Sequence, residues 1–232
     1  MARALVVQNI ASEGLGWFQE WLPDAGLDVH PIHPYLGHRV PALVEGDALV
    51  VLGGPMGAHD DAAAPWLPSV RDLLASAVDD GVPTLGICLG AQLLAVACGG
   101  TVERGALGPE LGFDVVDVSV ADDLLEVGPL PVVQWHHDTV TVLPPAAALL
   151  ASSRRYAAQA FRVGDVAWGL QFHVEATLPM VAQWAQDEAE AVRAEAGVEP
   201  EELVGAVADA QHQLRTRGLA VAKRFARVIT GY

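Results

Sequence analysis

The chain has 232 residues, of which 52% are hydrophobic and 18% are charged, so it contains ample material for one buried core and does not resemble a disordered polyelectrolyte. Its formal net charge is −16, from 13 basic and 29 acidic residues. This balance argues against nucleic acid and anionic membrane surfaces as partners, because basic side chains that could neutralise phosphates are outnumbered about two to one.

Cysteine usage and the start of the chain favour a reducing cytoplasm. The two cysteines, Cys88 and Cys98, are too few for a disulfide framework. The first apolar run ends at Gln8 and is too brief for the apolar region of a signal peptide. The uncharged stretch 81–102 is as long as a membrane span, but Pro83 and several glycines indicate a strand, a turn and a helix buried in a protein core.

The first part of the chain alternates between predicted strands and predicted helices. Strands are predicted where short apolar runs end at glycine, proline or a polar residue, and helices where apolar residues recur every three or four positions. The predicted strands are 4–7, 29–32, 47–52 and 83–87, and the predicted helices are 14–21, 67–78 and 89–97. Continuous apolar strands that alternate with helices are typical of an α/β fold with a parallel sheet covered on both faces.

The pattern changes after residue 101. Shorter segments, which we expect to extend the sheet as mixed or antiparallel strands, cover 113–120, 132–135, 140–143, 157–161 and 166–172. From residue 178 the apolar spacing is helical, first through 184 and again over 203–229, with a junction near 197–200. We therefore expect one domain over 1–232, with 177–232 as a helical C-terminal extension packed on it.

One cysteine lies where an α/β protein can hold a nucleophile. Cys88 falls between a predicted buried strand and a predicted helix, with Gly86 and Gly90 two positions away on either side. A sharp strand-to-helix turn strains its central residue and crowds the neighbours, so glycine on both sides removes Cβ atoms that would clash. At a helix N-terminus the dipole favours the thiolate, and free N–H groups can bind an oxyanion. The alternative is a buried core cysteine between two packing glycines.

A base for this nucleophile is available at the end of the last predicted strand. Strand alternation puts Gln171, His173 and Glu175 on one face, so the carboxylate can orient the imidazole. Cys88, His173 and Glu175 are therefore the candidate catalytic triad of nucleophile, base and orienting acid. The alternative is a strand-end histidine paired with a neighbouring acid.

A glycine-rich segment, Gly53-Gly54-Pro55-Met56-Gly57, follows the predicted strand 47–52. It emerges at the carboxyl edge of the sheet, where ligands bind in open α/β folds. Its glycines permit close backbone approach, so the N–H of Gly54 can act with the N–H of Leu89 as an oxyanion hole. The alternative is a simple Gly-Pro turn.

In this order the three elements resemble class I glutamine amidotransferase domains, with a glycine-rich oxyanion loop, a Gly-x-Cys-x-Gly turn and a distant His-x-Glu pair. The resemblance covers Ala4 to Glu175 and is greatest to free-standing proteins similar to the glutaminase domain of GMP synthase. It implies a flavodoxin-like fold, with an open, mostly parallel sheet in three layers and helices on both faces.

The resemblance also implies an activity. Cys88 would attack the side-chain amide of glutamine, form a γ-glutamyl thioester and release ammonia, after which water would free glutamate. His173 would carry the proton, Glu175 would hold its ring, and Gly54 and Leu89 would bind the tetrahedral oxygen. The implied substrate contacts are Gly53, Met56, Gln92, Trp135 and His136, and no cofactor is implied.

Two residues depart from the family pattern. Trp135 stands where the glutaminase domains of GMP synthase usually carry serine, and His137 stands where glycine is expected. A bulky rim of this kind narrows the pocket or adapts it to another γ-glutamyl compound. A γ-glutamyl hydrolase or peptidase is therefore an alternative function, and a non-catalytic regulatory binding module is another.

The sequence contains neither a Walker phosphate loop nor the Ser-Gly-Gly-x-Asp pattern of an ATP pyrophosphatase. A synthetase that accepts the ammonia is thus expected as a separate polypeptide, unless the ammonia is simply released. We expect no metal site, because the adjacent His136 and His137 would point to opposite faces of a strand. The sequence does not predict an oligomeric state.

Overall fold

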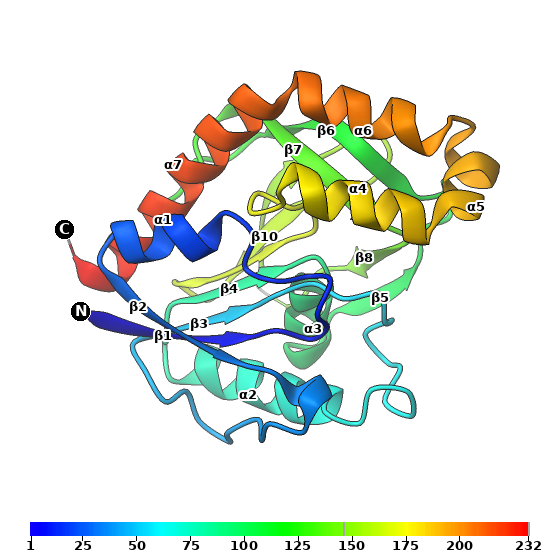
Figure 1. Ribbon diagram of the computed structural model, residues 1–232. Helices are drawn as coiled ribbons and strands as arrows, with labels where there is room; N and C mark the ends of the chain where they lie inside the picture. Colours follow the sequence, from blue (N-terminus) through cyan, green and yellow to red (C-terminus); the bar gives the residue numbers. More distant parts are fainter. Residues whose placement is uncertain (146, 232) are drawn as a thin grey trace.

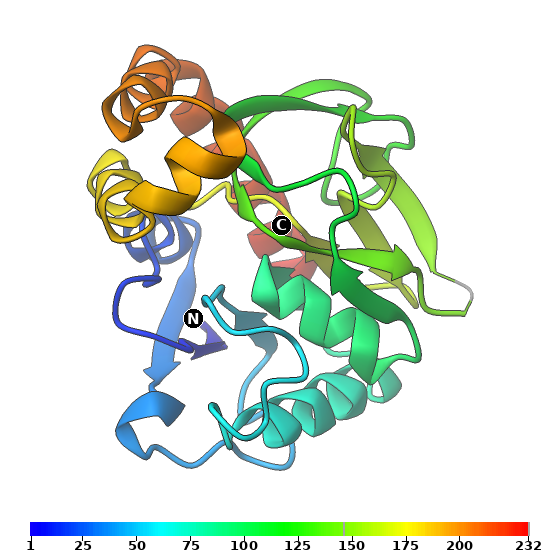
Figure 2. The same cartoon turned by 90° about the vertical axis from the view of Figure 1, so that its right-hand side faces the viewer.

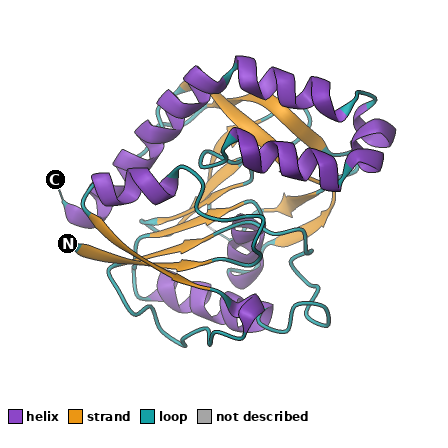
Figure 3. Cartoon of the chain, in the orientation of Figure 1, coloured by secondary structure: helices purple, strands orange, loops and turns teal. Residues whose placement is uncertain are grey.

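The computed structural model describes residues 1–145 and 147–231, and its centre is a nine-stranded sheet in the order β2-β1-β3-β4-β11-β10-β9-β6-β7 (Figures 1 and 3). Five strands pair in parallel, namely β2 (Leu27–Ile32), β1 (Ala2–Val7), β3 (Ala48–Val51), β4 (Thr84–Ile87) and β11 (Ala167–Leu170). Antiparallel pairing adds β10 (Ala160–Val163), β9 (Ala148–Ser152), β6 (Glu110–Val118) and β7 (Gly128–His136). The parallel part has the 2-1-3-4-5 order of flavodoxin-like folds.

Helices cover both faces of this sheet. Figure 1 shows one pair above it and another pair below it. The upper pair is α1 (Phe18–Asp24) and α7 (Gln211–Thr230), and the lower pair is α2 (Leu67–Asp79) and α3 (Leu89–Ala97).

Alternate residues of the central strands belong to the two opposite cores. In β1, Ala4 and Val6 pack with α1 and α7, while Leu5 and Val7 pack with α2 and α3. The strands are therefore buried on both faces, which explains their continuous apolar runs in the sequence. The predicted three-layer α/β fold class is confirmed.

The C-terminal segment adds further helices, α4 (Leu178–Asp187), α5 (Ala189–Ala191) and α6 (Pro200–Asp209), with a π-helical turn at Val192–Ala196. Figure 2 shows α4 to α6 gathered above α1 and away from α2. Their apolar side chains form a third cluster with Val133 and Trp135 of β7. Position 232, the end of the predicted extension, lies outside the described residues. Within the described ranges, no helix is long and apolar enough to cross a membrane.

Several local predictions were wrong. The segment 203–229 forms two helices, α6 and α7, because α6 packs against β6 and β7 while α7 packs on the central core. The predicted strand 140–143 does not extend the main sheet, because β8 (Asp138–Val142) pairs with β5 (Thr101–Arg104) in a separate two-stranded sheet. The first helix begins at Phe18 rather than at residue 14, since the preceding loop is tied to the site around Glu175.

Candidate active site

Cys88 occupies a strained turn between β4 and α3. Its φ of 51° and ψ of −108° make it the one non-glycine residue with positive φ among the described residues. A Cβ atom on Gly86 would lie 2.5 Å from the carbonyl oxygen of Gly90, and a Cβ atom on Gly90 would lie 2.0 Å from the carbonyl oxygen of Val51. Neither contact is sterically possible, so the turn has the geometry that its flanking glycines predict.

The thiol of Cys88 is buried, with 6% of the residue exposed. Its Sγ atom donates to the carbonyl oxygen of Trp135 at 3.6 Å and accepts from the side-chain amide of Gln171 at 3.9 Å. Burial raises the pKa of the thiol, while the neighbouring His173 acts in the opposite direction. In the free protein, burial therefore outweighs the helix N-terminus that we expected to favour the thiolate, and Cys88 is a thiol at neutral pH.

His173 and Glu175 form a buried pair just beyond β11. The imidazole Nδ1 donates to Oε1 of Glu175 at 2.7 Å, and both side chains are almost fully buried. Burial opposes the imidazolium, but the carboxylate of Glu175 and the adjacent Cys88 outweigh it and hold the pKa of His173 well above its usual value. Because Nδ1 is occupied, Nε2 is the ring nitrogen left for the thiol.

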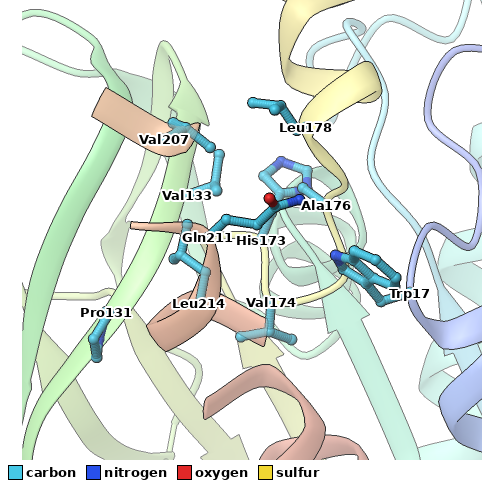
Figure 4. Close-up of a pocket in the computed structure, with 10 residues that line it drawn as sticks. All are labelled: Trp17, Pro131, Val133, His173, Val174, Ala176, Leu178, Val207, Gln211 and Leu214. Carbon is cyan, nitrogen blue, oxygen red and sulfur yellow. The ribbon is translucent and has the colours of Figure 1, made fainter. Parts of the chain in front are cut away.

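The ring of His173 is also fixed by packing. Its centroid lies 4.9 Å from that of Trp184 in α4, and its backbone N–H donates to the carbonyl oxygen of Val133 at 2.8 Å. Figure 4 shows a cavity of about 10 Å³ beside this ring, with apolar walls that include Leu178 of α4 and Leu214 of α7. That cavity is too small for a substrate, so it serves packing only.

The glycine-rich loop after β3 is held against the start of α3. The Nδ2 of Asn9 donates to the carbonyl oxygen of Leu52 at 2.8 Å, and a Cβ atom on Gly54 would lie 2.9 Å from Cδ2 of Leu89. Among the described residues, the N–H groups of Gly54 and Leu89 have no hydrogen-bond partner. Two free backbone donors therefore flank the cysteine turn.

An open pocket of about 290 Å³ lies over Cys88. Six of the residues predicted from the sequence line it, namely Gly54, Met56, Cys88, Gln92, Trp135 and His136. Four others, namely Gly53, Leu89, His173 and Glu175, are buried next to it and do not line it. The structure thus brings the predicted residues together at the carboxyl edge of β3, β4 and β11.

Two of the lining side chains are fixed by buried partners. The side-chain amide of Gln92 donates to the carbonyl oxygen of Asp138 at 3.2 Å and to Oε1 of Gln171 at 3.3 Å. The ring nitrogens of His136 pair with the carbonyl oxygen of Asp138 at 2.9 Å and with Glu110 at 3.1 Å. His136 therefore supports the pocket wall from within. Within the described residues, no three His, Cys, Asp or Glu side chains are grouped to hold a metal ion.

The two residues that depart from the family pattern share one partner. Glu188, which follows α4, accepts from Nε1 of Trp135 at 3.2 Å and pairs with Nε2 of His137 at 3.0 Å. Glu188 therefore draws both bulky side chains toward α4, so they form a wall rather than fill the pocket. The predicted extension contributes this wall directly to the site.

The pair of His137 and Glu188 is expected to make stability depend on pH. The hydrogen bond from His137 lowers the pKa of Glu188 from its usual 4.5, and the same bond raises the pKa of His137 from its usual 6.5. The Glu188 contribution is present above pH 4.5 and is lost in acid, while the His137 contribution is present below pH 6.5 and is lost as pH rises through the raised pKa. Both contributions coincide only between these two values.

Glu188→Gln is therefore expected to destabilise the protein most between about pH 4.5 and 6.5, by less than about 1 kcal/mol because the pair is partly exposed. Urea unfolding at pH 5.5 and pH 9 measures this difference, with the exposed Glu190→Gln as control. A penalty that grows toward pH 9 would contradict the assignment.

Sequence reasoning missed several residues of the site. Gln171 lies two residues before His173 on the same strand face, so its position could have indicated a contact with Cys88. Asn9 follows the first strand at the same sheet edge, which was the available signal for it. Glu13 and Glu188 lie in a loop and after a helix, and no spacing distinguishes them from surface acids.

The strand order and the edge geometry define a flavodoxin-like α/β protein with a cysteine at the strand-to-helix turn and a buried His–Glu pair beside it. The family model described as glutamine amidotransferase class I matches residues 25–184. The chain belongs to this family, and the resemblance noted from the sequence is confirmed.

Solved structures and curated sequences agree with this membership. Glutamine amidotransferase structures from Thermotoga maritima and Methylobacillus flagellatus superpose with a TM-score of 0.85 each, at 27% and 29% identity. They cover 97% and 99% of this chain, which in turn covers 97% and 94% of theirs. The glutamine amidotransferase-like protein YfeJ of Salmonella typhimurium is 29% identical over 77% of this chain and 78% of its own length.

Other relatives are named as GMP synthases. A separate-chain subunit of the glutamine-hydrolysing GMP synthase of Saccharolobus solfataricus is 31% identical over 65% of this chain and 77% of its own length. The GMP synthase of Thermosynechococcus vestitus is 33% identical over 55% of this chain, but that match spans 23% of the enzyme. The chain thus covers about a quarter of the length of the full-length GMP synthases that it matches.

Proposed function

We propose that this protein is a glutamine amidotransferase that hydrolyses the side-chain amide of glutamine and provides ammonia to a separate acceptor enzyme. One observation carries the proposal: the strained Cys88 lies at the base of an open pocket, next to a histidine whose Nδ1 is held by a buried carboxylate. A residue in such a conformation costs roughly 1 to 3 kcal/mol, and a glycine at this turn would avoid that cost. The strain argues that the cysteine side chain is needed.

The first half of the reaction forms a thioester. His173 accepts the thiol proton at Nε2 while Sγ of Cys88 attacks the amide carbon, and Glu175 stabilises the imidazolium through Nδ1. The free N–H groups of Gly54 and Leu89 stabilise the negative oxygen of the tetrahedral intermediate. His173 then returns the proton to the amide nitrogen, and ammonia leaves.

The second half consumes the thioester. Water loses a proton to Nε2 of His173 and attacks the γ-glutamyl carbon, and the thiol leaves with that proton. Gln92, Met56, Trp135 and His136 lie around the same pocket, and Gly53 lies against its wall, which supports their assignment to substrate binding.

Three further parts of the proposal concern organisation. The relative named as one subunit of a GMP synthase supports a synthetase that binds in trans. The contact of Glu188 with the pocket wall supports 1–232 as a single domain with 177–232 as an extension of it. Both cysteines are free thiols, which is consistent with the cytoplasm.

A γ-glutamyl hydrolase acting on another amide is the second candidate, and the rim supports it. Because Glu188 holds Trp135 and His137 to the side, the pocket keeps about 290 Å³, close to the lower end of the range for small-molecule sites. A γ-glutamyl compound larger than glutamine fits a pocket of that size.

Covalent labelling tests the function. We expect a diazo-ketone analogue of glutamine to add one equivalent of mass to the peptide that contains Cys88, and we expect the unlabelled protein to release glutamate from glutamine. Intact-protein and peptide mass spectrometry, with a coupled glutamate assay, measures both. Labelling together with turnover of γ-glutamyl amides but not of glutamine would select the hydrolase. Absence of any labelling would contradict both candidates.

A further inference from the structure

A carboxyl group that the mechanism above does not use faces the same pocket. Glu13 lies in the loop between β1 and α1 and lines the pocket together with Cys88. Its Oε2 atom is buried and has no hydrogen-bond partner among the described residues. A buried oxygen without a partner costs stability, so its retention indicates that something else completes it.

The position of this carboxyl is fixed by Gly53. A Cβ atom on Gly53 would lie 2.1 Å from Oε2 of Glu13 and 3.2 Å from Cε1 of His173. The carboxyl and the imidazole edge therefore pack against the same side of Gly53, and only glycine leaves space for both.

The loop that carries Glu13 is anchored at both ends. The indole Nε1 of Trp184 donates to the carbonyl oxygen of Ser12 at 3.2 Å, and the N–H of Trp17 donates to the carbonyl oxygen of Glu175 at 2.8 Å. Trp184 also packs on the ring of His173. The same elements that position the His–Glu pair thus position Glu13.

The geometry indicates which part of the reaction this carboxyl faces. Cε1 of His173 is bonded to both ring nitrogens, and Nδ1 is occupied by Glu175. Glu13 therefore approaches the edge next to Nε2, the nitrogen that returns a proton to the leaving amine. The free donors of Gly54 and Leu89 serve the oxyanion instead, so the carboxyl and these donors address different atoms of the substrate.

The charge state of Glu13 is suited to this place. Burial raises its pKa to about 7, with His173 acting against that shift and Glu175 and Glu188 adding to it. The charged and titratable groups around it are these three and Cys88. At neutral pH a substantial fraction is therefore carboxylate, and a nearby positive charge increases that fraction.

We propose that Glu13 is the leaving-group residue of the site, accepting a hydrogen bond from the amine nitrogen while that nitrogen becomes positively charged. The assignment rests on the proposed function. When Nε2 of His173 gives its proton to the nitrogen of the tetrahedral intermediate, the nitrogen becomes cationic. The C–N bond then breaks with its electron pair on nitrogen, the Sγ–C bond remains, and the amine departs as a neutral molecule. Glu13 gains and loses no proton in this step.

Two substrates that differ only in the leaving group test the assignment. Glutamine releases an amine, whereas the γ-methyl ester of glutamate releases methanol, whose oxygen is far less basic. Glu13→Gln is expected to lower kcat/KM for glutamine at least about tenfold, the size of one lost charge-assisted hydrogen bond, and to change kcat/KM for the ester less than about twofold. Glu45→Gln, at an exposed loop position, is the matched control.

Other outcomes overturn the assignment in distinguishable ways. Equal losses on both substrates would assign Glu13 a merely structural role, and unchanged activity on both would remove it from the site. The rate of Cys88 labelling by the diazo-ketone analogue, which loses no amine, reports folding independently and is expected to stay unchanged in Glu13→Gln. A wild-type protein that neither labels nor turns over either substrate would reject the proposed function and this assignment with it.

Discussion

Replacing Cys88 with alanine is expected to reduce glutamate release by on the order of 10⁴-fold or more, because no other group on the pocket floor can carry the γ-glutamyl intermediate. The protein should still fold, since alanine is smaller than cysteine and fits the same buried position. Glutamate formation at matched protein concentration measures the effect, and circular dichroism verifies the fold.

The second cysteine supplies the control. Cys98 follows α3 and is half-buried, at the opposite end of that helix from Cys88. Cys98→Ala is expected to keep glutamate release within about twofold of the wild type, as surface-like substitutions away from a site do. Residual activity of more than about 1% in Cys88→Ala, or a comparable loss in Cys98→Ala, would contradict the assignment of the nucleophile.

The parallel half of the fold was predictable because its strands are buried on both faces. Val50 and Val51 of β3 belong to opposite cores, so both positions must be apolar and the strand reads as an uninterrupted run. In contrast, β5 carries one buried residue, Val102, among exposed neighbours, and its pairing with β8 depends on contacts distant in sequence. A pattern that short does not identify a strand.

The break between α6 and α7 was missed for a related reason. Leu203 and Val207 pack in the cluster on β7, whereas Val221 and Phe225 pack in the central core. Apolar spacing records that a residue is buried but not against which element, so the change of packing partner leaves no trace in the sequence.

The same distinction separates the predicted and missed parts of the site. Cys88 and its glycines were recognisable because backbone strain restricts which residues can occupy the turn. Glu13 and Glu188 satisfy no such local restriction, since each reaches the pocket only through the packing of the chain around it. Both also lie outside the segment 25–184 that the family model matches. The features that distinguish this pocket within its family therefore come from outside the family's shared segment.

Substituting Gly90 with alanine is expected to have the largest effect on stability. The new Cβ atom would lie 2.0 Å from the carbonyl oxygen of Val51 and 2.8 Å from its carbonyl carbon, and both belong to the backbone of the central strand β3. A flexible side chain could move away, but a strand paired on both sides cannot. We expect a loss of roughly 3 kcal/mol or more in the free energy of unfolding, measured by urea denaturation.

Gly205→Ala is the matched control, because Gly205 also lies within a helix but its added Cβ atom would meet nothing within 4 Å. There the gain in helix propensity is expected to stabilise the protein by about 0.5 to 1 kcal/mol. The same chemical change should thus have opposite signs at the two positions. If Gly90→Ala were as stable as the wild type, α3 would not be packed against β3 as described, and the turn at Cys88 would not require glycine after it.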